Sequence, residues 1–438
     1  MSTPIPVPAA DPVTLARAVA KVKSHVLPLF VVMFIVNYID RVNIGFVKTH
    51  LQKDLGIGTA AYGFGAGLFF VGYALFEVPS NIFLQKVGAR AWLTRITLTW
   101  GIAAAAMALI KTETHFYALR FLLGVAEAGF FPGVIYYFTR WLPATERGKA
   151  IALFLSGSAI ASIISGPVSG ALLQIQGLGL HGWQWMFLIE GLASVALCGF
   201  VWTRLDSLPH DAKWLTREEQ DALVNTISDE QRRREATQTE KLSIGAMLKD
   251  LQILLFCGIY FAIQLTIYAA TFWLPSIIKK MGQMSDFEVG LFNSIPWIIS
   301  ILGMYLAASA SARWRFQQAW VAIALVVAAI GMLLSTSAGP IFAYVSVCFA
   351  AIGFKAASSL FWPIPQGYLD ARIAAGVLAL INSLGNLGGF VAPATFGFLE
   401  EKTGSIQGGL YGLACTSTLA AILIFLARTT PKPTSPRP

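Results

Sequence analysis

Two carboxylates and two guanidinium groups stand inside two otherwise apolar stretches of this sequence. Asp40 and Arg41 interrupt the first stretch, and Arg120 and Glu127 interrupt the fourth. A charged side chain in the middle of a membrane costs about 2.5–3.5 kcal/mol or more, so such groups face the protein interior and commonly serve substrate or ion pathways. Because Arg120 and Glu127 are seven residues apart, they share one helix face and differ in depth by about 10 Å.

These four groups have the chemistry to bind an anion and to carry a proton. A guanidinium group stays charged and forms two parallel hydrogen bonds with a carboxylate. A carboxylate in a low-dielectric site takes up a proton more readily, and an adjacent Arg opposes this. A substrate that occupied the Arg would remove that opposition, which would couple proton and anion movement. A buried salt-bridge network that only fixes helix packing is the alternative.

Three further ionisable residues lie within apolar stretches. We expect Glu77, near the inner end of the second stretch, and Glu190, about one turn into the sixth, to make structural contacts. Lys355 lies in the tenth stretch. It could attract an anion, extend to the membrane surface or pair with a carboxylate, and the sequence leaves these possibilities open.

The second half of the chain contributes polar groups more than charge. Several helical Asn, Gln, Ser and aromatic residues stand at spacings that place them on common helix faces. Such residues often serve only as hydrogen bonds between helices, but opposite an Arg-lined half they would suit hydroxyl and carboxylate groups. These candidates are Gln264, Tyr268, Ser358, Ser359, Trp362, Asn382 and Asn386, with Ser158 in the first half.

The composition places these residues in a membrane. Of 438 residues, 56% are hydrophobic and 13% charged, and the mean hydropathy is +0.64, whereas soluble domains carry about 25% charged residues. Twelve apolar stretches have the length of about 20 residues that a helix needs to cross a bilayer. We therefore expect an all-α integral membrane protein with helices at residues 25–47, 60–84, 91–111, 115–141, 147–175, 185–206, 250–280, 287–311, 317–337, 340–366, 372–400 and 406–428.

The expected helices divide into two groups of six. Residues 1–24 would form an N-terminal tail, 25–206 the first half, 207–249 a charged linker, 250–428 the second half and 429–438 a C-terminal tail. Thr216 and Glu219 predict a capping box that opens a short surface helix in the linker. This layout is typical of transporters with two pseudo-symmetric halves and a solute site between them.

The basic residues behind the net charge of +9 are distributed unevenly between the two sides of the membrane. Most Lys and Arg residues fall in segments on the side of the linker, which by the positive-inside rule places both termini in the cytoplasm. We expect a monomer in the bacterial inner membrane, in contact with the lipid bilayer and not with nucleic acid. The sequence contains no Walker A, HExxH or GxSxG motif and no CxxC pair, so we expect neither an enzyme nor a bound metal or cofactor.

Four segments carry a resemblance to a known family. NYIDRVN at residues 37–43, EVPSN at 77–81, RFLLGVAEAGFFPG at 120–133 and NSLGNLGGF at 382–390 resemble the anion:cation symporter family of the major facilitator superfamily. The resemblance implies proton-driven uptake of a small organic carboxylate: a sugar acid, a tartrate-like hydroxy acid or an aromatic acid. It also implies that Asp40 and Glu127 carry protons and that Arg41 and Arg120 serve the substrate.

The resemblance implies further site residues, and two features of this sequence differ from the usual pattern of the family. Tyr38, Ser158 and Asn386 match positions that line the cavity of sugar-acid members. Gln85 stands where the loop after the second helix usually has an Asp, and the Gly166-Pro167 step resembles an antiporter motif. An anion exchanger or facilitator therefore stays the alternative. Aromatic residues that could stack on an aromatic acid are Tyr38, Trp273, Trp297 and Trp362, so the choice between an aromatic and a polyhydroxy acid stays open.

Overall fold

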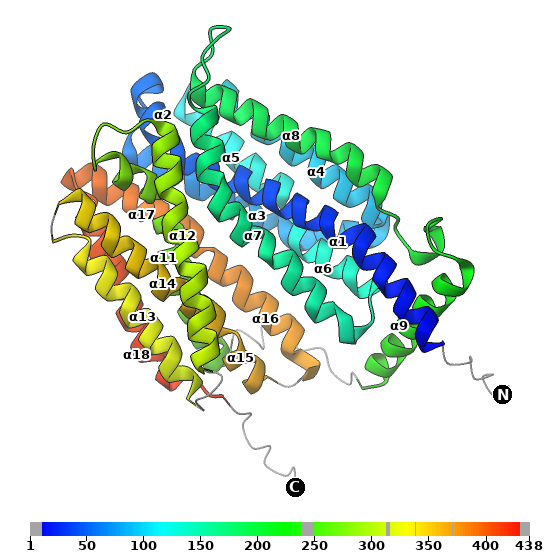
Figure 1. Cartoon of the computed structure of the whole chain (residues 1–438). Coiled ribbons are helices and arrows are strands. Elements are labelled where there is room, and N and C mark those ends of the chain that lie inside the picture. Colours follow the sequence, from blue (N-terminus) through cyan, green and yellow to red (C-terminus); the bar gives the residue numbers. More distant parts are fainter. Residues whose placement is uncertain (1–10, 238–248, 312–315, 338, 370, 430–438) are drawn as a thin grey trace.

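The protein is a bundle of long helices (Figure 1). The computed structural model describes residues 11–237, 249–311, 316–337, 339–369 and 371–429. Most of the expected C-terminal tail, and parts of the expected N-terminal tail and linker, lie outside these residues. Within them, twelve helical segments are long and apolar enough to cross a membrane, which confirms the expected all-α membrane fold.

The N-terminal half contains the first six membrane spans. Its membrane helices pack around Phe30, Phe69, Trp100 and Phe130, which are fully or almost fully buried. The elements of this half are α1 (Pro12–Val42), η1 (Asn43–Phe46), α2 (Lys48–Leu55), α3 (Thr59–Val87), α4 (Ala89–Ala106), η2 (Met107–Leu109), α5 (Glu113–Glu127), α6 (Phe130–Trp141), α7 (Ala144–Leu172) and α8 (Gly182–Arg204).

The C-terminal half contains the other six spans and lies beside the first half in Figure 1. A short linker segment with η3 (Pro209–Asp211) and α9 (Arg217–Thr237) precedes it. Its elements are α11 (Leu251–Lys279), α12 (Asp286–Ser311), α13 (Gln317–Leu334), α14 (Pro340–Phe361), α15 (Pro363–Tyr368), α16 (Ala371–Asn386), α17 (Gly388–Thr403), α18 (Gln407–Leu423) and η4 (Ile424–Leu426).

The two ends of the bundle differ in what they carry. We call the end with α9 and the start of α1 the linker end, and the opposite end, with α2, the α2 end (Figure 1). The last span also finishes at the linker end, because the side-chain amide of Gln252, at the start of α11, donates to the Leu426 carbonyl at 3.1 Å.

The first helix begins earlier than its hydropathy suggests. It starts at Pro12, where the Asp11 carboxylate accepts hydrogen bonds from the first turn, so much of the expected N-terminal tail is helical. Charged residues lower the hydropathy of this segment, but its apolar side, with Val19 and Val22, is buried. Lys21 pairs with Glu219 of the linker at 2.8 Å.

The fourth span is broken, whereas the sequence predicts one helix over residues 115–141. Helix α5 ends at Glu127, and α6 begins at Phe130. Gly129 between them has φ 87°, and a Cβ there would lie 2.3 Å from the Ser80 hydroxyl of α3. Both the backbone angle and the close approach require glycine. The break leaves Glu127 at the end of a half-helix inside the bundle.

The linker helix α9 docks on the N-terminal half. Its predicted capping box is confirmed, because the Thr216 backbone N–H donates to Glu219 at 2.9 Å and the Glu219 N–H donates to Thr216 at 3.3 Å. Further along α9, the Glu230 carboxylate accepts a hydrogen bond from the Ala144 backbone N–H, at the start of α7, at 3.0 Å. Arg147 also pairs with Glu230 at 3.1 Å. The described part of the linker therefore belongs to the N-terminal half.

Replacing Glu230 by alanine is expected to lower the free energy of unfolding by about 1 kcal/mol, because this carboxylate acts as a cap for an otherwise unpaired helix N–H. Thermal unfolding of the purified protein in detergent would show a lower midpoint. Asp229→Ala is the matched control, since that neighbouring carboxylate is exposed and pairs only at 3.8 Å with Arg232. Equal midpoints for the two variants would contradict the capping role.

Candidate functional site

An ion pair joins the first and fourth spans inside the bundle. Arg41 Nη2 of α1 lies 3.0 Å from Glu127 Oε2 and 3.3 Å from Asn37 Oδ1, one helical turn earlier. The Glu127 side chain is fully buried, and its second oxygen, Oε1, has no hydrogen-bond partner among the described residues. The break after α5 thus presents a carboxylate that has accepted only part of the hydrogen bonds it can take.

Arg120 lies beside this pair and is less well satisfied. Its guanidinium group is fully buried and donates from Nη2 to the Ala66 carbonyl at 3.0 Å. In the part of the chain that the structure describes, Nε and Nη1 have no hydrogen-bond partner. The guanidinium carbon lies 5.2 Å from the centre of the Phe69 ring, and that of Arg41 lies 5.1 Å from the same ring. One aromatic ring therefore stabilises two cations by cation–π contact.

Asp40 points away from these cations. Its Oδ2 accepts hydrogen bonds from Trp100 Nε1 at 3.0 Å and from Ser194 Oγ at 2.6 Å. Consecutive residues of a helix point about 100° apart, so Asp40 faces α4 and α8 while Arg41 faces α5. The expected single constellation of four charged groups is wrong: the structure brings together Arg41, Arg120 and Glu127 and places Asp40 elsewhere in the same half.

Glu190 occupies the same region of the N-terminal half as Asp40. It accepts hydrogen bonds from Asn43 Nδ2 at 2.7 Å and from Ser169 Oγ at 2.8 Å. These contacts join η1, α7 and α8, as expected for a structural carboxylate. Asp40 and Glu190 are both almost completely buried. Helix α8 connects the two carboxylates, because Ser194, which donates to Asp40, lies one turn beyond Glu190 on this helix.

Polar residues of the C-terminal half approach the interface at several points. The side-chain amide of Gln264 donates to Asn386 at 2.9 Å, so two of the predicted residues meet. Tyr268 places its ring 4.4 Å from that of Phe70 in the other half and interacts electrostatically with Arg41.

Other predicted residues make more local contacts. Ser158 and Ser359 donate to carbonyls of their own helices, at 2.8 and 3.1 Å. Trp362 packs on Tyr260 with ring centres 4.7 Å apart. For Asn382, the structure records no hydrogen bond within the described ranges. These four side chains are not brought into contact with Arg41 or Arg120.

Glu77 links the two halves. The hydroxyl of Ser383 in α16 donates to its Oε2 at 3.0 Å. The sequence predicts a structural hydrogen bond for Glu77, and the structure gives this bond a partner in the opposite half. The bond would have to break if α3 and α16 moved apart.

A small cavity of about 10 Å³ lies between the halves beside Tyr38. Four polar residues of its lining, Ser162, Ser165, Thr271 and Asn293, were not predicted from the sequence. Ser162 and Ser165 belong to a polar stripe along α7 that also includes Ser158 and Ser169, and this spacing is a signal that could have found them. The lining residues are Tyr38, Val42, Phe46, Ser162, Ser165, Thr271, Asn293 and Trp297.

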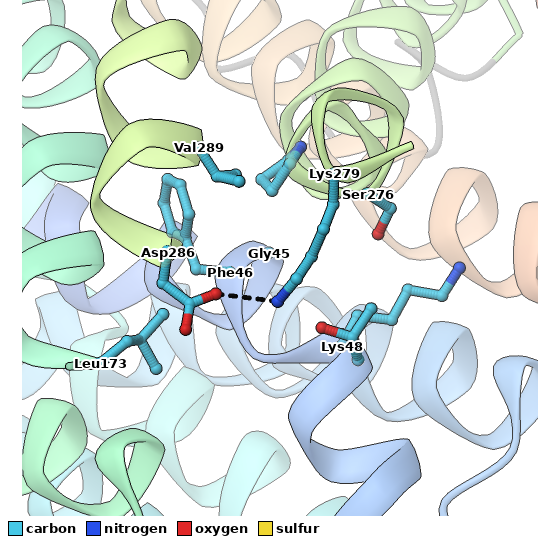
Figure 2. Close-up of a pocket in the computed structure, with 10 residues that line it drawn as sticks. Gly45, Phe46, Lys48, Leu173, Ser276, Lys279, Asp286 and Val289 are labelled. Carbon is cyan, nitrogen blue, oxygen red and sulfur yellow. Dashed lines mark hydrogen bonds and ion pairs between the residues drawn. The ribbon is translucent and has the colours of Figure 1, made fainter. Parts of the chain in front are cut away.

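The α2 end is closed by charged contacts between the halves. Lys48, which is buried, pairs with Glu400 of α17, and Trp273 Nε1 donates to the same carboxylate at 2.7 Å. Figure 2 shows a second group, in which Lys279 reaches Asp286 at 2.8 Å. His50 of α2 approaches the same Asp286 at 3.3 Å.

Close backbone contacts also seal this end. A Cβ on Gly166 of α7 would lie 2.2 Å from the Gly290 carbonyl oxygen of α12, and one on Gly290 would lie 2.1 Å from the Gly166 carbonyl oxygen. Helices α3 and α17 meet in the same way, since a Cβ on Gly63 would lie 2.0 Å from the Pro393 carbonyl oxygen. Small residues allow membrane helices to approach this closely.

The family of the chain follows from its sequence. The profile of the Major Facilitator Superfamily matches residues 29–393, a range that includes both charged spans. The chain belongs to the Major Facilitator Superfamily. The membership expected from the motifs is therefore confirmed, and the protein is a multi-pass transporter of the bacterial inner membrane and not an enzyme.

Relatives in this superfamily match along nearly the whole chain. A protein of Agrobacterium vitis named "Putative tartrate transporter" is 41% identical over 420 residues, which cover 95% of this chain and 93% of that protein. A quinolone resistance transporter of Acinetobacter baumannii is 42% identical, with 92% and 93% covered. The inner membrane transport protein RhmT of Escherichia coli is 36% identical, with 94% and 96% covered.

Solved structures share the fold at much lower identity. The crystal structure of a D-xylose-proton symporter has a TM-score of 0.73 at 15% identity, with 92% of this chain and 97% of that chain covered. A bacterial homologue of the human lysosomal transporter Spinster has a TM-score of 0.74 at 16% identity, with 92% and 96% covered. These likenesses show a common arrangement of twelve helices in two halves.

Proposed function

We propose that this transporter is a proton-coupled symporter that imports a small organic anion by alternating access. The observation that carries the proposal is the fully buried Arg120, whose Nε and Nη1 have no hydrogen-bond partner within the described residues. An unsatisfied guanidinium group in a low-dielectric site is costly unless a ligand completes it. A carboxylate fits because it accepts two parallel hydrogen bonds from one guanidinium group. The relative named for tartrate supports an anionic substrate.

Coupling would work through the Arg41–Glu127 pair. A substrate carboxylate near Arg120 adds negative charge beside Glu127 and competes for Arg41, which lies on the same Phe69 ring. Both effects favour the protonated form of Glu127. Substrate binding and proton uptake would then support each other, as symport requires.

Asp40 is the second proposed proton carrier. It lies on α1 next to Arg41 but faces Trp100 and Ser194, and its Oδ1 has no hydrogen-bond partner in the described ranges. A change in its protonation would alter the contacts of α1 with α4 and α8. The position of Arg41, on the same helix, would respond to that change. Asp40 would thus act on the substrate through α1 and not by contact.

The remaining ligands would come mainly from the C-terminal half. The contacts of Tyr268 with the Arg41 region and of Gln264 with Asn386 support a role for these three residues in lining the pathway. Tyr38 opens on the cavity between the halves. Other conformations of the transport cycle would expose further side chains to the pathway. We propose the same lining role for Ser158, Lys355, Ser359, Trp362 and Asn382.

We also propose that the linker end faces the cytoplasm. The Lys and Arg residues that favour this orientation by the positive-inside rule include Arg17, Lys21 and Lys23 near the start of α1. The α2 end would then face the periplasm. The ion pair between Lys48 and Glu400 would then help to close the periplasmic side of the transporter.

Glu127→Gln and Asp40→Asn are each expected to reduce proton-driven uptake of the anion into proteoliposomes at least a hundredfold, because an amide keeps the size of the side chain but cannot carry the proton. Counterflow, in which labelled anion enters by exchange with internal anion, is expected to persist in Glu127→Gln. Glu113→Gln is the control, since that carboxylate is exposed at the start of α5.

Wild-type proton-driven uptake in both variants would contradict the proposal and would leave the buried carboxylates with a packing role. If the wild-type protein itself shows counterflow but no proton-driven uptake, the alternative, an organic-anion exchanger, would be favoured. Uptake that equilibrates without a counter-anion would favour a facilitator.

A further inference from the structure

Asp40 and Glu190 form a pair of buried carboxylates inside the N-terminal half. The two residues are 1% and 5% exposed, and they interact electrostatically with each other. Each accepts hydrogen bonds from uncharged indole, hydroxyl or amide groups. Across the described ranges, neither carboxylate has an ion pair with a Lys, Arg or His residue. The pair therefore differs from Glu127, whose charge is balanced by Arg41.

Two contacts between the first and sixth spans place these carboxylates close together. Asn43, one turn after Asp40, donates to Glu190 at 2.7 Å, and Ser194, one turn after Glu190, donates to Asp40 at 2.6 Å. Helix α1 runs toward the α2 end, whereas α8 runs away from it and leads into the linker. The two contacts are therefore neighbours along the helices, about 5 Å apart. Glu190 lies nearer the α2 end than Asp40 does.

The surroundings of the pair disfavour a charge on both members. Burial penalises each charge, and two carboxylates that share a site repel each other, so such a pair tends to hold one proton. The other charged groups nearby do not offset this repulsion. Glu127 repels a charge on Asp40, and Arg41 is already paired with Glu127. A total charge of −1 on the pair is therefore favoured over −2.

Two buried oxygen atoms indicate where such a proton would bind. Oδ1 of Asp40 and Oδ1 of Asn43 both lack a hydrogen-bond partner within the described part of the chain. Both atoms accept hydrogen bonds and neither can donate one. A proton on Asp40 Oδ1 would supply a donor for the Asn43 oxygen, one turn away, while the Asn43 amide nitrogen keeps its bond to Glu190. Asn43 would then stabilise the form with a protonated Asp40 and a charged Glu190.

The α2 end controls access of water to Glu190. Ser169, which donates to Glu190, lies three residues before the end of α7 at Leu172. The next residue, Gly170, packs tightly against the start of α12, since a Cβ there would lie 2.5 Å from the Asp286 carbonyl oxygen. Separation of α7 from α12 would remove this cover and let water approach Glu190 from the α2 end.

We propose that Glu190 is a proton-relay residue that receives the coupling proton from the periplasm and passes it to Asp40. The proton first binds Glu190 while the α2 end is open. It then moves to Asp40 Oδ1, and the pair carries a charge of −1 before and after this step. Release toward the cytoplasm leaves both members charged, which favours uptake of the next proton. This inference rests on the proposed function, because it assumes that Asp40 carries a coupling proton.

The test is Glu190→Gln in the full-length protein in proteoliposomes. The probe is the acid that the wild-type protein takes up fastest from a panel of tartrate and sugar acids. Proton-driven uptake is expected to fall at least tenfold, because the amide cannot carry the proton. Counterflow is expected to change less than twofold, because exchange needs no net proton movement. A merely structural role would lower both activities to the same extent.

Proton entry gives a second readout. A pH-sensitive dye inside the proteoliposomes measures the protons that enter with the labelled acid. The ratio of protons to acid molecules is expected to fall in Glu190→Gln. A variant that is only misfolded or slow would reduce both fluxes and keep the wild-type ratio, and that result would overturn the relay.

Two further variants serve as controls. Glu190→Asp keeps an ionisable group and is expected to restore driven uptake at least threefold above Glu190→Gln. Asp206→Asn is the matched control, because the Asp206 carboxylate also accepts a hydrogen bond from an indole N–H, that of Trp214 at 3.0 Å, but lies at the linker end. This variant is expected to change neither driven uptake nor counterflow.

The two proposals fail in different ways. If the relay alone is wrong, the wild-type protein accumulates the acid in response to the proton gradient, and Glu190→Gln either does so equally well or loses driven uptake and counterflow together. If the proposed function is wrong, the wild-type protein shows no proton-driven accumulation of any acid in the panel, which overturns both proposals.

Discussion

Arg120→Ala is expected to abolish binding and uptake of the organic anion, with a loss of at least a hundredfold in affinity. The guanidinium group is fully buried, and two of its nitrogen atoms lack partners, so a bound carboxylate gains both hydrogen bonds and ion pairing there. Removing one partner of a buried charged pair costs about 3–5 kcal/mol, and 1.4 kcal/mol corresponds to a tenfold change in affinity. Thermal stabilisation by ligand and uptake into proteoliposomes measure the two effects.

Two variants sharpen this prediction. Arg120→Lys keeps the charge but loses the planar fork, so we expect an affinity between those of the wild type and Arg120→Ala. Arg95→Ala is the matched control, because Arg95 lies in the same half and packs on the ring of Trp92 at 3.9 Å. Anion binding that survives in Arg120→Ala would move the substrate site away from this group.

Gly166→Leu is expected to hold the transporter open at the α2 end and to reduce uptake to below one tenth of the wild-type rate. A side chain at this position has no room in the closed state, because even its Cβ would lie 2.2 Å from the Gly290 carbonyl oxygen. Backbone on both sides limits relaxation, so α7 and α12 must separate. Alternating access then stops, since the α2 end cannot close.

Spin labels on introduced cysteines would report this separation. Gln174 and Gln283 are exposed at the α2 end, one in each half. In a cysteine-free background, the distance between labels at these positions is expected to increase in Gly166→Leu. Gly199→Leu is the control, because a Cβ at Gly199 meets nothing within 4 Å. An unchanged distance distribution in Gly166→Leu would show that the contact does not hold this end closed.

Hydropathy was sufficient to predict twelve spans but not their internal breaks. Ala128 and Gly129 continue the apolar pattern of the fourth span, so nothing in the pattern predicts a break after Glu127. The break arises from a tertiary contact, the approach of Gly129 to Ser80 of α3. The same limit applies to α9, because a charged segment such as that around Glu230 looks solvated until its partner at Ala144 is known.

The depth of the charged residues could be predicted, but their grouping only in part. Counting residues along the spans places Asp40, Arg41 and Arg120 at similar depth, and this led to one expected cluster. Depth says nothing of rotation about the helix axis, and the rotation sends Asp40 to Trp100 and Arg41 to Glu127. Asn293 was missed because no polar residue stands one helical turn before or after it to give a periodic signal, apart from the indole of Trp297.

The most direct test of the central claim is uptake of a radiolabelled sugar acid or tartrate-like hydroxy acid by wild-type protein in proteoliposomes with an inward proton gradient. We predict accumulation above the external concentration, abolished when a protonophore collapses the gradient. Uptake that ignores the gradient but persists by exchange with internal organic anion would contradict proton-coupled symport.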